Sequence, residues 1–236
     1  MATIPCRPAA RWIPLGLAAT VLVSGMVVGS AASLPVTTQQ MVAYKTCTLT
    51  GFVSPSSVAD TYVVQDGATN NFGNNADMRV KSDPGKARRP FVRFDLTRCS
   101  PSIPAGAIVK HAQLRLFVNN DPPSIRNYEV RRVTAPCPQG LGTCWGETTL
   151  TWNNQPSVAG SPTDTVTICS GGACNNQYYA WTVTPDVAAW LAGTAANYGW
   201  RVSDAAEGLS NAEAQFRTWN EGRAEHGPQL VIVYVP

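Results

Sequence analysis

The stretch Gln113-Leu114-Arg115-Leu116-Phe117-Val118 decides the fold class of this chain, because apolar and polar side chains alternate along it. Successive side chains of an extended strand point to opposite faces, so every second residue from Leu114 to Val118 shares one face. The stretch Phe91-Val92-Arg93-Phe94-Asp95-Leu96 repeats the pattern. Its apolar residues Val92, Phe94 and Leu96 share one face. Both stretches predict strands with one buried and one solvated face.

Similar short runs of β-branched and aromatic residues recur between turn clusters along the rest of the chain. Strands are expected at 61–64, 78–81, 91–95, 112–118, 128–133, 164–168, 180–183, 199–203, 215–219 and 229–235. This spacing is typical of an all-β fold. We therefore predict an antiparallel β-sandwich, jelly-roll-like, over residues 58–236.

One short helix is expected near residues 185–193. Thr184 suits the N-cap, Pro185 suits the first helical position, and Gly193 can end the helix. We expect this helix to close one end of the sandwich.

The first 32 residues have the pattern of a signal peptide. Arg7 and Arg11 precede an apolar stretch over residues 12–29, and Ser30-Ala31-Ala32 offers small residues for a signal peptidase. The alternative is an uncleaved membrane anchor, since the apolar stretch is near the lower length limit for a spanning helix. Either way the chain is expected to be secreted or exported, with residues 33–57 forming an N-terminal linker or arm.

Six cysteines follow the leader, an even number that favours three disulfides over a metal site in an oxidising compartment. Cys137 and Cys144 flank one Gly-rich loop, Cys169 and Cys174 flank another, and Cys47 and Cys99 remain. The two short loops are the expected pairs, although six cysteines allow many connectivities. Zinc is disfavoured because neither histidine is near them in the sequence.

The charge balance is almost neutral. The chain has 18 Lys and Arg against 15 Asp and Glu, a net charge of +3, and loss of Arg7 and Arg11 with the leader leaves about +1. A nucleic-acid partner would call for a clearly basic domain, so we expect none. Binding to a membrane surface is disfavoured for the same reason, and no stable membrane insertion is expected after cleavage of the leader.

Several blocks carry a family resemblance. They are Ala59-Asp60-Thr61-Tyr62-Val63, Asn70-Asn71-Phe72-Gly73-Asn74, Ile103-Pro104-Ala105-Gly106-Ala107, Trp152-Asn153, Asn197-Tyr198-Gly199 and the closing Pro228-Gln229-Leu230-Val231-Ile232-Val233-Tyr234. In their order and spacing the sequence resembles the DNRLRE (disaggregatase-related) domain, which is grouped with the family ninety-six carbohydrate-binding modules. The resemblance implies a secreted β-sandwich that binds polysaccharide, in some members an acidic polymer such as alginate, without cutting it.

The candidate ligand-binding residues are a cluster of basic residues and two tryptophans. They are Arg79, Lys81, Arg88, Arg89 and Arg93, with Trp152 and Trp219. Arginine pairs bidentately with carboxylates, so the basic residues are suited to acidic sugars, and a sugar ring can stack on an indole. The alternative is a solvated strand face whose charges are neutralised, with aromatics that belong to the core.

Oxygen donors cluster in the loop that follows the first predicted strand of the domain. Asp60, Asp66, Asn70 and Asp77 are the candidate ligands for a calcium ion. The alternative is an ordinary Asn/Gly turn, because the loop has no spaced Asp-x-Asp-x-Asp pattern.

No catalytic residues are expected, because no motif selects a pair of carboxylates or a nucleophile with its base. The leading hypothesis is a secreted, non-catalytic module whose partner is a polysaccharide. A structural or adhesive surface protein is the alternative, and a polysaccharide hydrolase or lyase comes third.

Overall fold

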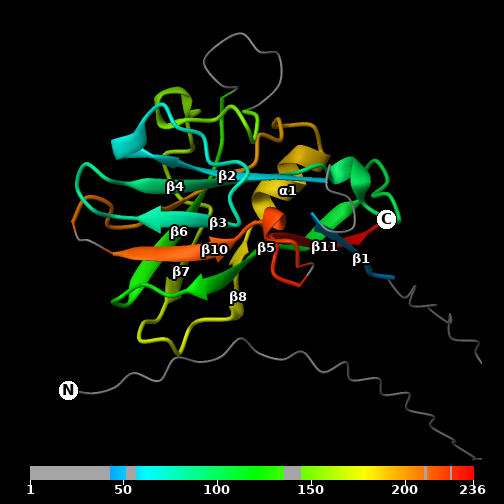
Figure 1. The fold of residues 1–236 in the computed structure, drawn as a ribbon. Helices are drawn as coiled ribbons and strands as arrows, with labels where there is room; N and C mark the ends of the chain where they lie inside the picture. The colour runs from blue at the N-terminus through cyan, green and yellow to red at the C-terminus, as the bar shows by residue number, and fades with distance from the viewer. Residues whose placement is uncertain (1–42, 52–56, 136–144, 210–211, 224) are drawn as a thin grey trace, which may run out of the picture. The chain divides into compact units, whose positions relative to one another are not determined.

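The computed structural model describes residues 43–51, 57–135, 145–209, 212–223 and 225–236, and their strands pair antiparallel throughout (Figure 1). The strands are β1 (Lys45–Thr50), β2 (Val58–Val64), β3 (Asp77–Lys81), β4 (Arg88–Phe94), β5 (Ile108–Asn120), β6 (Arg126–Arg132), β7 (Asp164–Ile168), β8 (Gln177–Thr182), β9 (Trp200–Asp204), β10 (Glu213–Arg217) and β11 (Gln229–Val235). The helical segments are α1 (Thr184–Leu191) and the 3-10 turns η2 (Gln65–Gly67), η3 (Leu96–Arg98), η4 (Trp152–Asn154) and η5 (Trp219–Glu221). The all-β prediction is confirmed, and every predicted strand overlaps an observed one.

Strand β5 organises the first layer because it is paired along both edges. Val118 pairs with β8 and β10 at once, and Gln113 pairs with β8 and β11 at once. Strand β8 therefore runs along one edge of β5, while β11 and then β10 follow the other. Strand β1 pairs with the outer edge of β11, which gives the order β1-β11-β5-β8.

Strand β4 organises the second layer in the same way. Phe91 pairs with β2 and β9 at once, and β9 continues through β6 to β7. The order of this layer is therefore β2-β4-β9-β6-β7. Strands β3 and β10 form a ribbon that joins the layers, because β10 pairs with β5 and β3 pairs with β4 at Arg88. The sandwich is one continuous sheet folded over itself.

The core lies between these layers. Trp181 of β8 donates its indole N–H to the backbone oxygen of Tyr128 on β6, at 2.9 Å. Phe216 of β10 contacts both rings edge to face. Leu114, Leu116 and Val118, which were predicted to share one face, are buried here as expected. Phe117 on the opposite face is also buried, against the rings of Tyr178 and His226.

The expectation that each strand has one dry face is wrong for β4. Val92 and Phe94 are buried in the main core, but Phe91 on the opposite face is buried as well. Trp145 packs edge-on against Phe91, with ring centroids 5.7 Å apart, and Leu150 joins the same second apolar cluster. The segment after residue 144 therefore covers part of the outer face of this layer.

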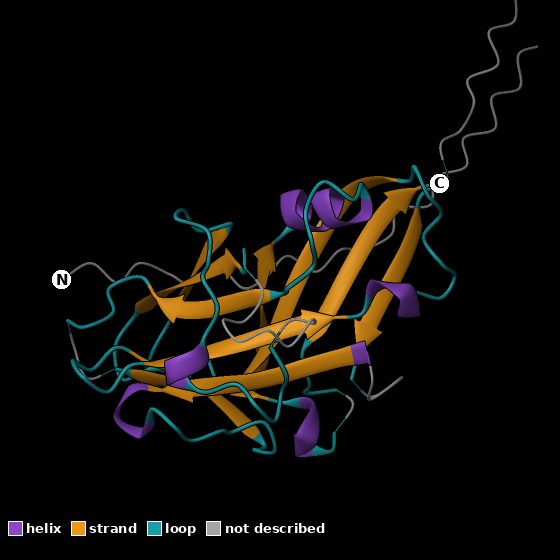
Figure 2. Ribbon diagram, turned by 90° about the horizontal axis from the view of Figure 1, so that it is seen from above, coloured by secondary structure: helices purple, strands orange, loops and turns teal. Residues whose placement is uncertain are grey.

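Helix α1 confirms the predicted helix, with a correction at its start. Val183, not Thr184, is the N-cap residue. The Thr184 hydroxyl instead accepts a hydrogen bond from the backbone N–H of Ala112 at 2.9 Å, which fixes α1 to β5. In Figure 2 the helical segments, in purple, lie in the connections between the orange strands. Within the described residues no helix is long and apolar enough to cross a membrane.

Two disulfides are present in the described residues. Cys47 of β1 is bonded to Cys99, with Cα atoms 5.5 Å apart, and Cys169 is bonded to Cys174. The predicted pair Cys137 and Cys144 lies outside the described residues. Residues 45–50, which we assigned to the N-terminal arm, form an edge strand of the sheet.

Candidate functional site

Three of the predicted basic residues lie at the hairpin of β3 and β4, each paired with an acid. Arg79 and Arg88 contact the carboxylate of Glu213, at 3.4 and 2.7 Å between nitrogen and oxygen. Lys81 lies 3.6 Å from Asp83. Their positive charges are therefore balanced locally, as expected for a neutralised strand face.

Arg89 and Trp152, both predicted from the sequence, are brought together on the outer face of β4. The Arg89 guanidinium lies 4.3 Å from the centroid of the Trp152 ring. It also donates two hydrogen bonds to Glu207, at 2.9 and 2.5 Å, and one to Gln155 at 2.9 Å. The tryptophan and the two acceptors hold the arginine in one position.

Two more arginines lie beside this pair through the pairing of β9 and β6. Arg201 of β9 pairs with Phe91 of β4 on one side and with Arg131 of β6 on the other. Arg131 is held by Glu129, with nitrogen–oxygen distances of 2.9 and 2.7 Å, and by backbone oxygens of the loop after β6. We call Arg89, Arg131, Arg201, Trp152, Glu129, Glu207 and Gln155 the arginine face.

Arg201 differs from its two neighbours because it has no hydrogen bond or ion pair among the described residues. Its Nε atom is buried without an acceptor. Burial, and then the positive charge of Arg89, lower the pKa of Arg201 to about 10. Arg201 is therefore still charged at neutral pH, in surroundings that disfavour the charge.

The arginine face can therefore take an anion. Its three arginines face two glutamates, which leaves one positive charge unmatched. Both glutamates are already engaged by Arg89 and Arg131. A carboxylate placed at the terminal nitrogens of Arg201 would balance its charge and accept charge-assisted hydrogen bonds from the guanidinium.

Four members of the arginine face were not predicted as binding residues from the sequence: Arg201, Arg131, Glu129 and Glu207. The only local signal for Arg201 was a single basic residue within the predicted strand 199–203. Nothing in that stretch indicates which arginines lie across from it, because this depends on the order of strands in the layer.

The other predicted aromatic residue, Trp219, is hydrogen-bonded to two carboxylates and does not present an open ring face on which a sugar could stack. Its backbone N–H donates to Asp60 Oδ2 at 3.0 Å, and its indole N–H donates to Glu147 Oε1 at 3.0 Å. The ring also packs against the main core. Through these contacts Trp219 connects η5 to strand β2 and to the segment that contains Glu147.

The four predicted calcium ligands are not gathered into one site. Asp60 is fully buried beside Trp219, and Asp77 is paired with Arg217 at 2.9 Å. Asp66 and Asn70 are exposed. No group of three or more His, Cys, Asp or Glu side chains suited to a metal ion occurs in the described part of the chain. Calcium binding therefore stays a prediction, and we assign no role through it.

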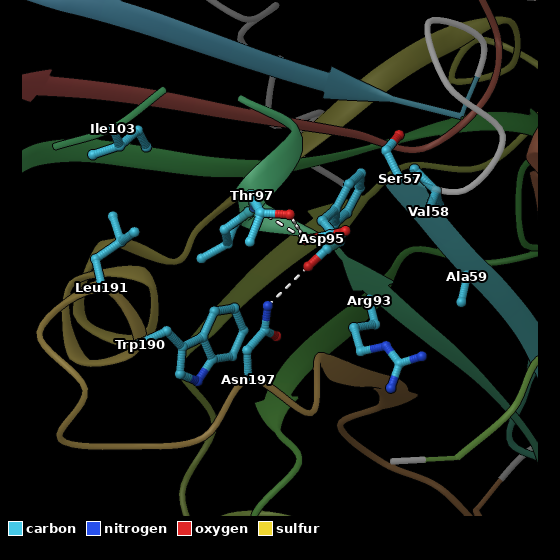
Figure 3. A pocket seen from close by; sticks show the side chains of 12 residues that line it. Ser57, Val58, Ala59, Arg93, Asp95, Thr97, Ile103, Trp190, Leu191 and Asn197 are labelled. Atoms are coloured by element: carbon cyan, nitrogen blue, oxygen red, sulfur yellow. Dashed lines mark hydrogen bonds between the residues drawn. The ribbon is translucent and has the colours of Figure 1, made fainter. Parts of the chain in front are cut away.

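Arg93, the remaining predicted basic residue, lies at the far end of β4. It lines a pocket of about 630 Å³ together with residues of β2, η3, α1 and the loop before β9 (Figure 3). Its guanidinium lies 5.4 Å from the centroid of the Trp145 ring and has no ion pair among the described residues.

The chain is thus an antiparallel β-sandwich with an arginine-rich outer face and a pocket beside helix α1. The model of carbohydrate-binding module family 96 matches residues 52–234, and the chain belongs to this family. The resemblance seen in the sequence is thereby confirmed, and carbohydrate binding is the function of the family. A search of curated proteins finds no match to the chain.

Proposed function

We propose that this protein is a secreted, non-catalytic module that docks on an anionic polysaccharide through the arginine face. The observation that carries the proposal is Arg201. This cation is partly buried and has no acceptor among the described residues, and the two arginines whose charges act on it, Arg89 and Arg131, are already paired. A uronic acid carboxylate has the charge and shape to fill that position.

Trp152 and Glu207 act as positioning residues in this proposal. A guanidinium over an indole ring is attracted by the ring electrons, and the two hydrogen bonds from Arg89 to Glu207 fix its orientation. Arg89 is therefore ordered before any ligand arrives, which lowers the entropic cost of binding.

One feature supports binding without catalysis, and another supports secretion. The glutamates on the arginine face are engaged by arginines, whereas a glycosidase needs two carboxylates that act on opposite sides of a sugar bond. The Cys47–Cys99 and Cys169–Cys174 disulfides are typical of an oxidising compartment, in keeping with the leader-like N-terminus.

The test is the affinity of Arg201→Gln for long polyuronates such as alginate and polygalacturonate, measured by calorimetry. Loss of a charge-assisted contact should weaken binding by roughly tenfold or more. Arg115→Gln is the matched control, because Arg115 lies on β5 in the other layer, over Tyr178. This control should retain the affinity of the wild type.

Two further measurements complete the experiment. Thermal unfolding monitored by circular dichroism should show that both variants are folded. The same polymers with their carboxyl groups reduced should bind far more weakly than the acids. Equal binding of acidic and reduced polymers, or an unchanged affinity of a folded Arg201→Gln, would contradict the proposal, and released oligosaccharide would contradict the absence of catalysis.

A further inference from the structure

The pocket at the end of β4 is separate from the charged side chains of the arginine face and has no role in the function proposed above. Its volume of about 630 Å³ lies in the usual range for small-ligand sites. Trp190 and Leu191 of α1 lie across it from Ser57, Val58 and Ala59 at the start of β2 (Figure 3). The pocket is therefore bounded by several elements, unlike the outer face of a sheet.

Apolar and polar residues both line the pocket. Ile103, Trp190 and Leu191 form an apolar wall on the side of α1 (Figure 3). The other apolar residues are Val58, Ala59, Phe94 and Leu96, and the polar residues are Ser57, Arg93, Asp95, Thr97 and Asn197. Such a combination suits a sugar, which presents C–H groups on the faces of its ring and hydroxyl groups around the edge.

Two of the polar lining residues, Asp95 and Asn197, are held in place before a ligand binds. Asp95 Oδ1 accepts hydrogen bonds from the backbone N–H and the hydroxyl of Thr97, at 3.0 and 2.6 Å. The Asn197 amide donates to the backbone oxygen of Phe94 at 2.8 Å and accepts from the N–H of Gly199 at 3.1 Å. These bonds fix both side chains while leaving acceptor capacity on the Asp95 carboxylate.

The pocket also has an unpaired positive charge. Arg93 has no hydrogen bond or ion pair among the described residues, and its guanidinium lies 5.4 Å from the centroid of the Trp145 ring. Asp95 does not neutralise it, because the carboxylate is paired with Arg98 at 3.4 Å and bonded to Thr97. A neutral sugar would leave Arg93 without an acceptor, whereas a carboxylated sugar would supply one.

We propose that this pocket binds the terminal residue of a uronic acid chain, with Arg93 pairing with its carboxylate and Asp95 accepting from its hydroxyls. The apolar wall around Trp190 would cover one face of the sugar ring. A pocket bounded by α1, η3 and β2 suits a chain end, whereas the arginine face suits internal segments. This inference rests on the proposed function and adds recognition of chain ends at a second position.

The test compares uronic acid chains of different length at equal total mass. Shortening the chains increases the number of ends, so a site for chain ends should capture more of the shorter material. We expect this dependence in the full wild-type chain, measured by calorimetry with polyuronate and its oligosaccharides. Arg93→Gln should lower the affinity for short oligosaccharides by roughly tenfold or more and leave the affinity for long polymer unchanged.

Two further variants keep the test decisive. Lys110→Gln removes one charge from an exposed position of β5 that does not line the pocket, and it should behave as the wild type. Ile103→Trp fills the pocket without changing charge, and it should abolish the dependence on chain ends even if Arg93→Gln fails to fold.

The outcomes separate this inference from the proposed function. Wild-type binding that does not depend on the number of ends, a folded Arg93→Gln that keeps the dependence, or equal capture of neutral oligosaccharides would overturn the pocket assignment. None of these results changes the comparison of Arg201→Gln with Arg115→Gln on long polymer, which tests the arginine face alone.

Discussion

Asp60 lies in surroundings that are poorly suited to its charge. It is fully buried, and only its Oδ2 atom has a partner, the backbone N–H of Trp219 at 3.0 Å. Burial raises the pKa of Asp60 well above 3.8, and the nearby Glu147 raises it further, against the effect of the Trp219 hydrogen bond. Burial also raises the pKa of Glu147.

These pKa directions predict a pH-dependent stability. The folded protein keeps a proton on Asp60 at pH values where the unfolded chain has released it, so the free energy of unfolding falls as pH rises above about 4. Asp60→Asn removes this contribution, so its stability relative to the wild type should increase from pH 4 to pH 7. Denaturant titrations across this range give the difference, with the exposed Asp66→Asn as control; a constant difference for Asp60→Asn would contradict the assignment.

At the scale of elements, the contact of β4 with the turn that enters β9 decides where the arginines of the second layer lie. Gly199 has a φ of 77°, and a Cβ there would lie 2.3 Å from the backbone oxygen of Val92 and 2.7 Å from the Cβ of Arg93. Asn197 adds its bond to Phe94 from the same turn. The Asn197-Tyr198-Gly199 block therefore allows β9 to approach β4 closely enough to pair.

This close approach predicts a difference between two glycine substitutions. Gly193 has a similar φ of 70°, but a Cβ at that position would meet no atom within 4 Å. Both alanine variants lose about 1 to 2 kcal/mol from left-handed strain, and only Gly199→Ala adds a steric clash, worth about 1 to 3 kcal/mol. Gly199→Ala should therefore be the less stable variant in urea unfolding; equal midpoints would show that the turn can relax.

For the whole folded domain, the Cys47–Cys99 disulfide connects the edge strand β1 to the segment after β4. These cysteines are 52 residues apart in the sequence, whereas Cys169 and Cys174 are 5 apart. A disulfide restricts the unfolded chain more when it closes a longer loop. The two bonds should therefore contribute unequally to stability.

The expected losses follow from loop length. The Cys47→Ser/Cys99→Ser double variant should lose about 4 kcal/mol of unfolding free energy, and the Cys169→Ser/Cys174→Ser variant about 2 kcal/mol. Guanidinium denaturation of both double variants measures this order directly. A larger loss from the short loop would mean that local packing, and not restriction of the unfolded chain, sets the contribution.

Among the features of the candidate site, the sequence identified Arg89 and Trp152 but not their relation to each other. It also identified Arg79 and Arg88 without their neutralising partner Glu213, which is 134 residues from Arg79. Residue type indicates what chemistry a side chain can perform. Whether its charge is free or matched depends on contacts between distant parts of the chain.

The sequence by itself determined the all-β class, the approximate strand positions, the short helix and the family, because alternation with period two and turn chemistry are local properties. Only the tertiary structure decided that β9 lies between β4 and β6, and so that Arg201 lies opposite Arg131 and feels the charge of Arg89. Strand order and register are set by packing of the whole sandwich. The sequence of a single strand does not show which strands pair with it.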